Sequence, residues 1–251
     1  MVRLLAIIIV VIMCVGCDAE NAPDCFQAAG DTIKKEFVVP EYSKISVLQR
    51  TQLIVKQGIA QSVVVETGEN LLDDIDIYVQ DGTLIIDNKN ACNLVREYGL
   101  TKVYVTQQEL SEIRNASGLP VRSDGMLSYA TLQLTSEDLE TEDAFHKTGD
   151  FYLELTCDSL SIITNGKSNF FLSGAVNTLD LQFMEGDSRF EGKDLSVNTA
   201  TIFHRGTNDI YLNPRNAVTG ELRSTGNLIL FNTPPVLDVK ALYKGKVIIK
   251  N

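Results

Sequence analysis

The 251-residue sequence has no tryptophan, six prolines and two histidines. A site that uses an imidazole as a general base would have to contain one of these two histidines, and no triad-like pattern surrounds either one. Basic residues are also few, because 22 Lys and Arg face 33 Asp and Glu, a formal net charge of −11. This balance argues against nucleic acid as a partner, since binding phosphates requires Lys and Arg to displace counterions. It also disfavours bare anionic lipid, because no local basic patch is apparent.

Long apolar runs are absent except at the start, where Leu4–Met13 follows Arg3. A membrane-spanning helix needs about 20 apolar residues, and this run is about half as long. It leads into Cys14-Val15-Gly16-Cys17, which is similar to a bacterial lipobox, whose last cysteine is acylated and becomes the new N-terminus. We therefore predict a lipoprotein signal peptide at residues 1–16 and lipid attachment at Cys17, with ordinary secretion as the alternative.

The predicted anchor determines how we divide the rest of the chain and where we expect it in the cell. Acyl chains contribute about 0.8 kcal/mol per buried methylene, so they would hold the protein to a membrane without a spanning helix. We expect the outer membrane, on its surface or its periplasmic face. Residues 17–35 would form the lipidated cysteine and a flexible tether rich in Asn, Pro, Ala and Gly, and residues 36–251 one folded domain.

Three cysteines remain for an oxidising compartment, Cys25, Cys92 and Cys157, so one of them must stay unpaired. A disulfide between Cys25 and Cys92 would tie the tail to the first half of the domain, and it is the pairing we expect. The wide spacing of the three fits no zinc pattern.

Short runs of β-branched and apolar residues predict strands through the first half of the domain. Turn residues separate them at Glu66–Glu69 and Gln80–Thr83. Asn93–Gly99 and Gln107–Glu112 could give at most a turn or two of helix. The expected strand cores are Phe37–Val39, Ile45–Val47, Leu53–Val55, Val63–Val65, Ile75–Val79, Leu84–Ile86, Val103–Val105 and Leu132–Leu134.

Glycines repeat through the second half at intervals of 17, 20, 20, 20 and 19 residues, and the residue four positions after each is apolar. Coils of about 20 residues with an aligned apolar column predict an all-β fold, a parallel β-solenoid (β-helix), with an antiparallel β-sandwich as the alternative. The polar residues before each glycine would be solvated corners. The glycines are Gly149, Gly166, Gly186, Gly206, Gly226 and Gly245, and the predicted column is Leu153, Phe170, Phe190, Ile210, Leu230 and Ile249.

No catalytic, metal or cofactor site is expected. The acidic run at 137–143, beside His146, could gather oxygen ligands for calcium, but it lacks the spacing of a calcium loop and reads by default as a solvated loop. We interpret His204 as a solvated corner residue. Asp73, Asp74 and Asp76 could likewise hold a cation, but by default they form a polar strand face or a turn. Carboxylates that could meet on one face, as glycoside hydrolysis would need, also arise by chance in stacked coils. These are Asp150, Glu154, Asp187, Glu191 and Asp209.

Five segments follow the lipobox through the first half of the domain: Phe37–Val47, Leu53–Gly58, Val63–Gly68, Asp81–Ile86 and Val103–Ile113. In this order they resemble the putative auto-transporter adhesin, head GIN domain family, found in envelope lipoproteins. The resemblance covers about Phe37 to Asn251, although Asn115-Ala116-Ser117-Gly118 stands where family members have Gly-Ser-Gly turns. It implies a right-handed β-helical fold and a role in adhesion or envelope interaction, and it supplies no catalytic residues.

These observations predict a non-enzymatic, lipid-anchored adhesion or ligand-binding module. Exposed aromatic residues such as Tyr152, Phe171 and Tyr211 could bind glycans or proteins by stacking and hydrogen bonding, or could serve only in packing. Two alternatives stay open. One is a glycan-active enzyme on the same scaffold, and the other is a structural or signalling lipoprotein that binds another envelope protein.

Overall fold

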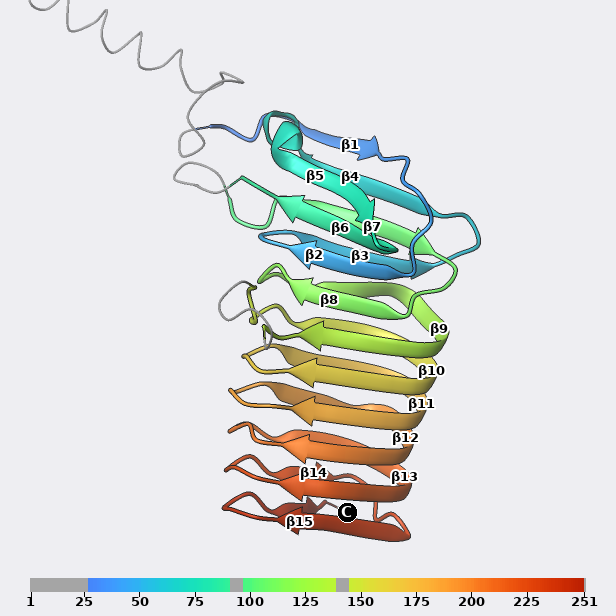
Figure 1. Ribbon diagram of the computed structural model, residues 1–251, viewed down its shortest axis with the longest axis vertical. Helices are drawn as coiled ribbons and strands as arrows, with labels where there is room; N and C mark the ends of the chain where they lie inside the picture. Colours follow the sequence, from blue (N-terminus) through green and yellow to red (C-terminus); the bar gives the residue numbers. More distant parts are fainter. Residues whose placement is uncertain (1–26, 91–96, 139–144, 251) are drawn as a thin grey trace, which may run out of the picture.

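The computed structural model describes residues 27–90, 97–138 and 145–250. Over these ranges every regular element except one short 3-10 helix is a strand, and the strands form one mixed, 16-stranded sheet (Figure 1). No helix within them has the length and apolar character needed to cross a bilayer. The elements are β1 (Thr32–Glu36), β2 (Lys44–Leu48), β3 (Gln52–Gln57), β4 (Ser62–Gly68), the 3-10 helix η2 (Glu69–Asp74), β5 (Ile75–Gln80), β6 (Thr83–Asn88), β7 (Lys102–Gln107), β8 (Glu112–Ala116), β9 (Val121–Ser136), β10 (Phe151–Thr164), β11 (Asn169–Phe183), β12 (Arg189–His204), β13 (Ile210–Leu222), β14 (Leu228–Leu230), β15 (Val236–Ala241) and β16 (Val247–Ile249).

Each long strand serves two faces of the molecule. The start of β9 pairs with β3, whereas its end pairs with β8. In the same way, the start of β13 pairs with β14 and its second half with β15. We call the face that contains β1, β4, β7, β3 and β14 the first face, and the face that contains β5, β6, β2, β8 and β15 the second face. Both faces run the length of the stack (Figure 1).

From β9 to β13 every neighbouring pair of strands runs parallel, and each strand adds the next layer of the stack (Figure 1). Parallel neighbours of this length are what stacked coils predict and what an antiparallel sandwich forbids. The all-β prediction is therefore confirmed, the arrangement is consistent with a β-solenoid, and the sandwich alternative is wrong for this half.

The first half of the chain is more mixed. β1 pairs antiparallel with β4, β4 with β7, and β5 with β6. The turn expected at Gln80–Thr83 is confirmed, because Asp81 and Gly82 both have positive φ angles, 50° and 72°, as a tight hairpin requires. The turn expected at Glu66–Glu69 is wrong, since β4 continues to Gly68, paired with Thr32, and the chain then enters η2.

The positions of some strands in the first half also differ from the prediction. Phe37–Val39 follows β1 instead of forming a strand, and Val38 is fully exposed. The strand that does form there, β1, lies within the stretch interpreted as tether, and its sequence is polar because an edge strand needs only backbone pairing with β4. Glu112, expected in a turn or short helix, begins β8.

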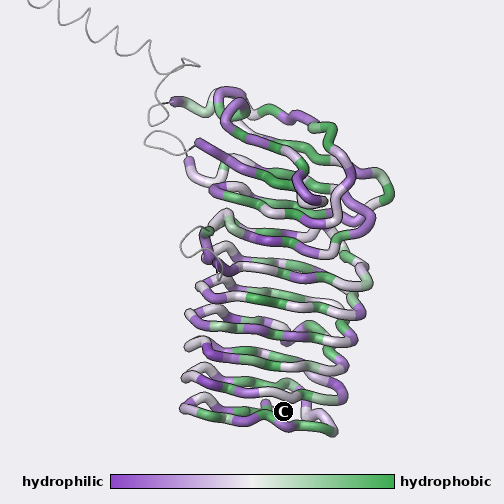
Figure 2. Tube along the Cα trace, in the orientation of Figure 1, coloured by the Kyte–Doolittle hydropathy of each residue, from purple (hydrophilic) through white to green (hydrophobic). Residues whose placement is uncertain are grey.

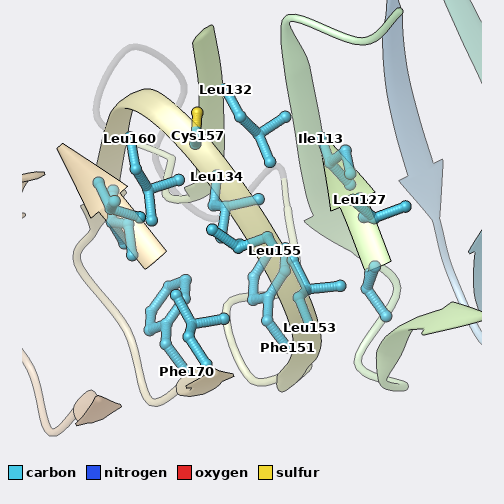
Figure 3. Packing of buried hydrophobic residues seen from close by; sticks show 14 of the residues in the cluster. Ile113, Leu127, Leu132, Leu134, Phe151, Leu153, Leu155, Cys157, Leu160 and Phe170 are labelled. Carbon is cyan, nitrogen blue, oxygen red and sulfur yellow. The ribbon is translucent and has the colours of Figure 1, made fainter. Parts of the chain in front are cut away.

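The hydrophobic core lies between the two faces along the whole stack. Hydrophobic and hydrophilic residues alternate along many of the strands (Figure 2), and successive side chains of a strand point to opposite faces. In the centre of the stack, Phe151 and Phe170 stack inside the core with ring centroids 4.9 Å apart (Figure 3). Burying one such side chain contributes about 1.5–3 kcal/mol, so the repeated columns supply most of the stability.

The predicted apolar column is correct in the centre and shifted at both ends. Phe170, Phe190 and Ile210 are aligned as expected. Leu153 aligns instead with Leu172, and the true partner of Phe170 in β10 is Phe151. A shift of two residues keeps a side chain on the same face, so the error leaves the inward side unchanged. The observed column is Phe151, Phe170, Phe190, Ile210, Leu228 and Val247.

Close approach of the backbone explains the repeating glycines. A Cβ at Gly186 would lie 2.2 Å from the carbonyl oxygen of Gly166, and one at Gly245 would lie 2.2 Å from that of Gly226. Stacked corners therefore leave no room for side chains at these positions. The residues that precede the glycines are mostly exposed, as expected, but Asn165 is buried.

Candidate functional site

A column of aromatic side chains points outward from the first face. Tyr152 in β10 is in register with Phe171 in β11, and Tyr211 occupies the same outward position in β13, with Glu191 of β12 between. Phe231 follows β14 and lies 6.3 Å from Tyr211 between ring centroids. We call Tyr152, Phe171, Tyr211 and Phe231 the aromatic ladder. Each ring is half-buried, because alternation places it outward between two inward core residues.

The upper part of the aromatic ladder is a continuous stack. The rings of Tyr152 and Phe171 lie 4.7 Å apart and within 6° of parallel. Arg122, one layer above in β9 and paired in register with Tyr152, places its guanidinium 4.1 Å from the Tyr152 ring centre. A cation over an aromatic face is attractive, so this arginine covers the free end of the stack.

The lower part is also lined with cations. Arg189 lies 4.5 Å from the ring centre of Tyr211 and forms an ion pair with Glu191. The ammonium of Lys250 lies 5.7 Å from the Tyr211 ring and 5.9 Å from the Phe231 ring, and that of Lys193 lies 5.8 Å from Phe231. The ring faces are therefore largely occupied by neighbours, and the two tyrosine hydroxyls donate to Asp150 and Asp209 at 3.4 Å. The ring edges and the cationic groups remain available to a ligand.

Sequence reasoning identified Tyr152, Phe171 and Tyr211 but missed most of the cations beside them. Arg189 and Lys193 read as scattered in sequence, yet both lie outward on β12 next to the ladder. One coil of separation brings residues about 20 positions apart into contact. That register would have found Lys250, which follows Phe231 by 19 positions, but not Arg122, which precedes Tyr152 by 30 positions.

A second column of side chains lies at the corners, one residue before the inward residues of the core column. It includes Asp150 and Asp209, two of the carboxylates considered for glycoside hydrolysis. Asp150 accepts hydrogen bonds from the backbone N–H and side-chain amide of Asn169, at 2.8 and 2.9 Å. Asp209 accepts the same pair from Asn227, both at 2.9 Å. Burial raises the pKa of the Tyr152 hydroxyl, and the neighbouring Asp150 carboxylate adds to that shift. These acids therefore hold successive corners together.

Each of the other candidate carboxylates described below either binds a neighbouring side chain or is exposed on its strand. Asp187 accepts a hydrogen bond from the Thr207 hydroxyl at 2.7 Å, and Glu154 is exposed on β10. Asp76 forms an ion pair with Lys89 at the hairpin edge. Over the described ranges, no group of three His, Cys, Asp or Glu side chains is placed to hold a metal ion.

His204 is not the solvated corner residue expected from its sequence context. It ends β12 with no exposed surface, and its Nε2 lies 2.8 Å from the carbonyl oxygen of Asn208. Since a carbonyl can only accept, Nε2 carries the proton. Burial lowers the pKa of the imidazole, although the bond to Asn208 opposes this shift. The prediction failed because His204 occupies an inward position, in register with Phe183 and Leu222.

The acidic run is described only at its start, because residues 139–144 lie outside the described ranges. Glu137 accepts a hydrogen bond from Arg114 at 2.6 Å. Asp138 is buried, pairs with Lys147 at 2.7 Å and accepts a 2.8 Å hydrogen bond from the Asn165 amide. These first two acids are thus bound within the fold, in contrast to the solvated loop that was expected, while His146 is exposed.

Of the cysteines, only Cys157 falls within the described ranges. It is a free thiol, buried on β10, and its Sγ donates to the carbonyl oxygen of Ser159 at 2.9 Å. Burial raises the pKa of this thiol, which makes it a packing residue and not a nucleophile. Cys17, Cys25 and Cys92 lie outside the described residues, so the lipid attachment and the disulfide stay predictions.

Comparison with solved structures shows the fold alone, at low identity. The chain is similar to a putative adhesin from Bacteroides fragilis NCTC 9343, with a TM-score of 0.76, 18% identity, and coverage of 88% of this chain and 97% of that one. It is also similar to a putative adhesin from Parabacteroides merdae ATCC 43184, with a TM-score of 0.60, 15% identity and coverage of 88% and 97%. A protein from Parabacteroides distasonis ATCC 8503 named as a putative lipid binding protein gives a TM-score of 0.61, 15% identity and coverage of 87% and 97%.

No curated protein matches the sequence. A family model does match, over residues 41–234, which is most of the chain and includes every strand from β2 to β14. That span contains the parallel stack and all of the aromatic ladder. The chain therefore belongs to the family described as putative auto-transporter adhesin, head GIN domain.

Proposed function

We propose that this protein is a non-enzymatic cell-envelope lipoprotein whose stacked domain is an adhesion module for glycans. Membership of an adhesin-like family supports a place in the envelope or at the cell surface. In this proposal, acyl chains on Cys17 hold the chain to the outer membrane, and the stack extends from that anchor.

The aromatic ladder is the observation that carries the proposal. Tyr152, Phe171 and Tyr211 lie half-buried in one outward column, so binding a ligand there costs little side-chain entropy. Arg122 and Arg189 present guanidinium groups beside the rings, which can donate hydrogen bonds to sugar hydroxyls or carboxylates. Aromatic edges and fixed donors on a flat face suit an extended saccharide better than a small molecule.

The alternative of a glycan-active enzyme finds less support. Hydrolysis of a glycosidic bond needs two carboxyl groups on opposite sides of the bond. The acids closest to the ladder already bind their own coil or its neighbour, since Asp150 and Asp209 accept from corner asparagines and Glu191 pairs with Arg189.

The test is a glycan array and a whole-cell binding assay with the chain from Gln27 onward, which keeps every described strand. We expect saturable binding that falls at least tenfold in the variants Tyr152→Ala and Arg122→Ala, a loss of about 1.4 kcal/mol. Tyr98→Ala is the matched control, because Tyr98 is exposed and distant from the ladder in the fold. Circular dichroism shows whether each variant folds. Cleavage of any glycan, or loss of binding in the control alone, contradicts the proposal.

The anchor is tested separately in whole cells with Cys17→Ser. We expect the unaltered chain to partition into the membrane fraction and to yield an acylated N-terminal peptide by mass spectrometry. The variant should be released into the soluble fraction by a high-salt wash, because it lacks the acyl chains and no helix in the described ranges is long and apolar enough to cross a bilayer. Equal membrane retention of both forms would contradict the anchor without affecting glycan binding.

A further inference from the structure

Charge is distributed unevenly along the stack. Residues 27–88, which form the end that contains β1 and β5, hold ten acidic and five basic residues. Residues 189–250, at the other end, hold nine basic and five acidic residues. Figure 1 places these two groups at opposite ends of the long axis. The acidic net charge of the whole chain therefore hides a basic end.

The basic charge is concentrated in the last coil. Residues 236–250, which we call the basic end, carry four lysines and a single aspartate, Asp238. Lys240 lies on β15, Lys244 and Lys246 flank the corner glycine, and Lys250 follows β16. Within the part of the chain that the structure describes, none of the four forms an ion pair. This corrects the expectation that the chain has no local basic patch.

Apolar side chains are exposed in the same coil. Leu237 is in register with the buried Val218, and Ile249 with the buried Leu230, so both occupy inward positions. They are nevertheless 39% and 42% exposed, because no described coil covers them. Leu242 and Tyr243, in the loop between β15 and β16, are 54% and 61% exposed. The basic end thus combines uncovered core residues with ammonium groups that form no ion pair within the described residues.

From this combination we infer that the basic end docks on an anionic lipid bilayer. Lysines attract anionic headgroups, and leucine, isoleucine and tyrosine side chains enter the boundary between headgroups and acyl chains. The basic end lies at the far end of the stack from β1, where the chain enters the fold (Figure 1). With the proposed anchor at the other end, the stack would bridge two surfaces, but binding at the basic end does not depend on glycan binding or on the anchor.

A second copy of the chain is the competing occupant of this end. Contact between two basic ends brings like charges together. A head-to-tail contact would pair the basic end with the acidic end and is favoured by charge, but the polar, exposed β1 there offers little apolar surface to Leu242 and Tyr243. Protection of an open sheet edge by lysines is the remaining explanation, and it predicts no affinity for lipid.

The experiment uses the chain from Gln27 onward, since all buried core side chains lie beyond that residue, and vesicles of phosphatidylcholine with or without phosphatidylglycerol. We expect co-sedimentation with the anionic vesicles only, weakened by added salt. The variant Lys240→Gln/Lys244→Gln/Lys246→Gln should bind roughly a hundredfold less, about fivefold for each lysine. These three changes leave Lys250 and its contacts to the aromatic ladder intact.

The matched control is Lys35→Gln/Lys56→Gln/Lys167→Gln, which changes the net charge equally at exposed lysines elsewhere. It should bind like the parent, because only the basic end contacts lipid. A second variant, Leu242→Ser/Tyr243→Ser, keeps all lysines and should also weaken binding. No binding by the parent, or equal loss in both lysine triples, overturns the inference. Aggregation of the basic-end triple with unchanged vesicle binding would assign the lysines to edge protection instead. Head-to-tail oligomers of the parent without lipid binding would assign the basic end to contact between copies of the chain.

Discussion

At the scale of single residues, His204 couples stability to pH. Burial lowers its pKa below the ordinary value of 6.5, so the folded protein holds the neutral ring. Below pH 6.5 the unfolded chain binds a proton that the folded protein does not, and stability therefore falls as the pH drops. We expect a loss of up to about 1.4 kcal/mol for each pH unit between 6.5 and the lowered value.

The measurement is urea unfolding across this range for the parent chain and for His204→Gln. Glutamine keeps an N–H donor for the Asn208 carbonyl but does not titrate. The variant should show a shallower dependence of unfolding free energy on pH, with the difference confined to pH below 6.5. Identical slopes in the two proteins would mean that His204 titrates normally in the folded state.

Gly220 is required by both its backbone angle and its surroundings. Its φ is +130°, and a Cβ there would lie 2.0 Å from the carbonyl oxygen of Ile202. We expect Gly220→Ala to lower the unfolding free energy by at least about 2 kcal/mol, from strain and overpacking together. Gly125 is the matched control, because its φ is +86° but nothing lies within 4 Å. Gly125→Ala should cost only the strain, about 1 kcal/mol, and equal losses would show that contact adds nothing.

At the scale of elements, polar columns hold the corners of successive coils in register. Asp209 accepts two hydrogen bonds from Asn227, and Asn227 in turn accepts from the backbone N–H of Lys246. Asp209→Ala should lower the unfolding free energy by about 2 kcal/mol, because two half-buried donors lose a charged acceptor. Asp187→Ala is the comparison: it removes an exposed carboxylate with one hydroxyl donor, and we expect a loss under about 1 kcal/mol by thermal or urea unfolding. A larger loss for Asp187 would reverse this assignment.

The elements that sequence predicted well are those fixed by local patterns. Alternation marked Ile75–Val79 as a strand, and the hairpin after it followed from Asp81 and Gly82. Phe37–Val39 is also apolar, but only Phe37 bonds to β4, at the Val63 carbonyl oxygen, because β1 has already paired with most of that edge and β4 begins at Ser62. Composition records the preference of a segment for strand, whereas the partner comes from elsewhere in the chain.

The candidate site was predicted in part for a similar reason. Outward aromatics could be recognised singly, but their neighbours depend on the coil length at each layer. The interval from Phe151 to Phe170 is 19 residues, from Phe170 to Phe190 it is 20, and from Ile210 to Leu228 it is 18. Glycines mark only the corners, so the two-residue slips at Leu153 and Leu230 were invisible in their spacing. Burial of His204 was missed because it depends on the same register.

At the scale of the whole molecule, each layer of the stack touches mainly the layers directly above and below it. Such a fold behaves as a one-dimensional array, in which stability is approximately a sum over coils and the interfaces between them. Residues that are close in sequence are also close along the axis of the stack. Charges that cluster in one part of the sequence therefore stay together at one end of the molecule. A separate charge count for each coil, instead of one count over the whole chain, would have predicted the basic end from the sequence.

The array predicts that one whole coil can be removed. Deleting residues 190–209 joins Arg189 to Ile210, so Ile210 takes the place of Phe190 against Phe170, and the inward columns are kept apart from the bulges of β12. We expect this variant to fold cooperatively, with β-type circular dichroism and a lower melting temperature. Deleting residues 190–199 removes about half a coil and joins Arg189 to Ala200, which places second-face residues on the first face. That chain should fail to fold, because its core columns no longer align between layers. If both deletions unfolded alike, the layers would have to depend on contacts beyond their immediate neighbours, and the one-dimensional description of the stack would be wrong.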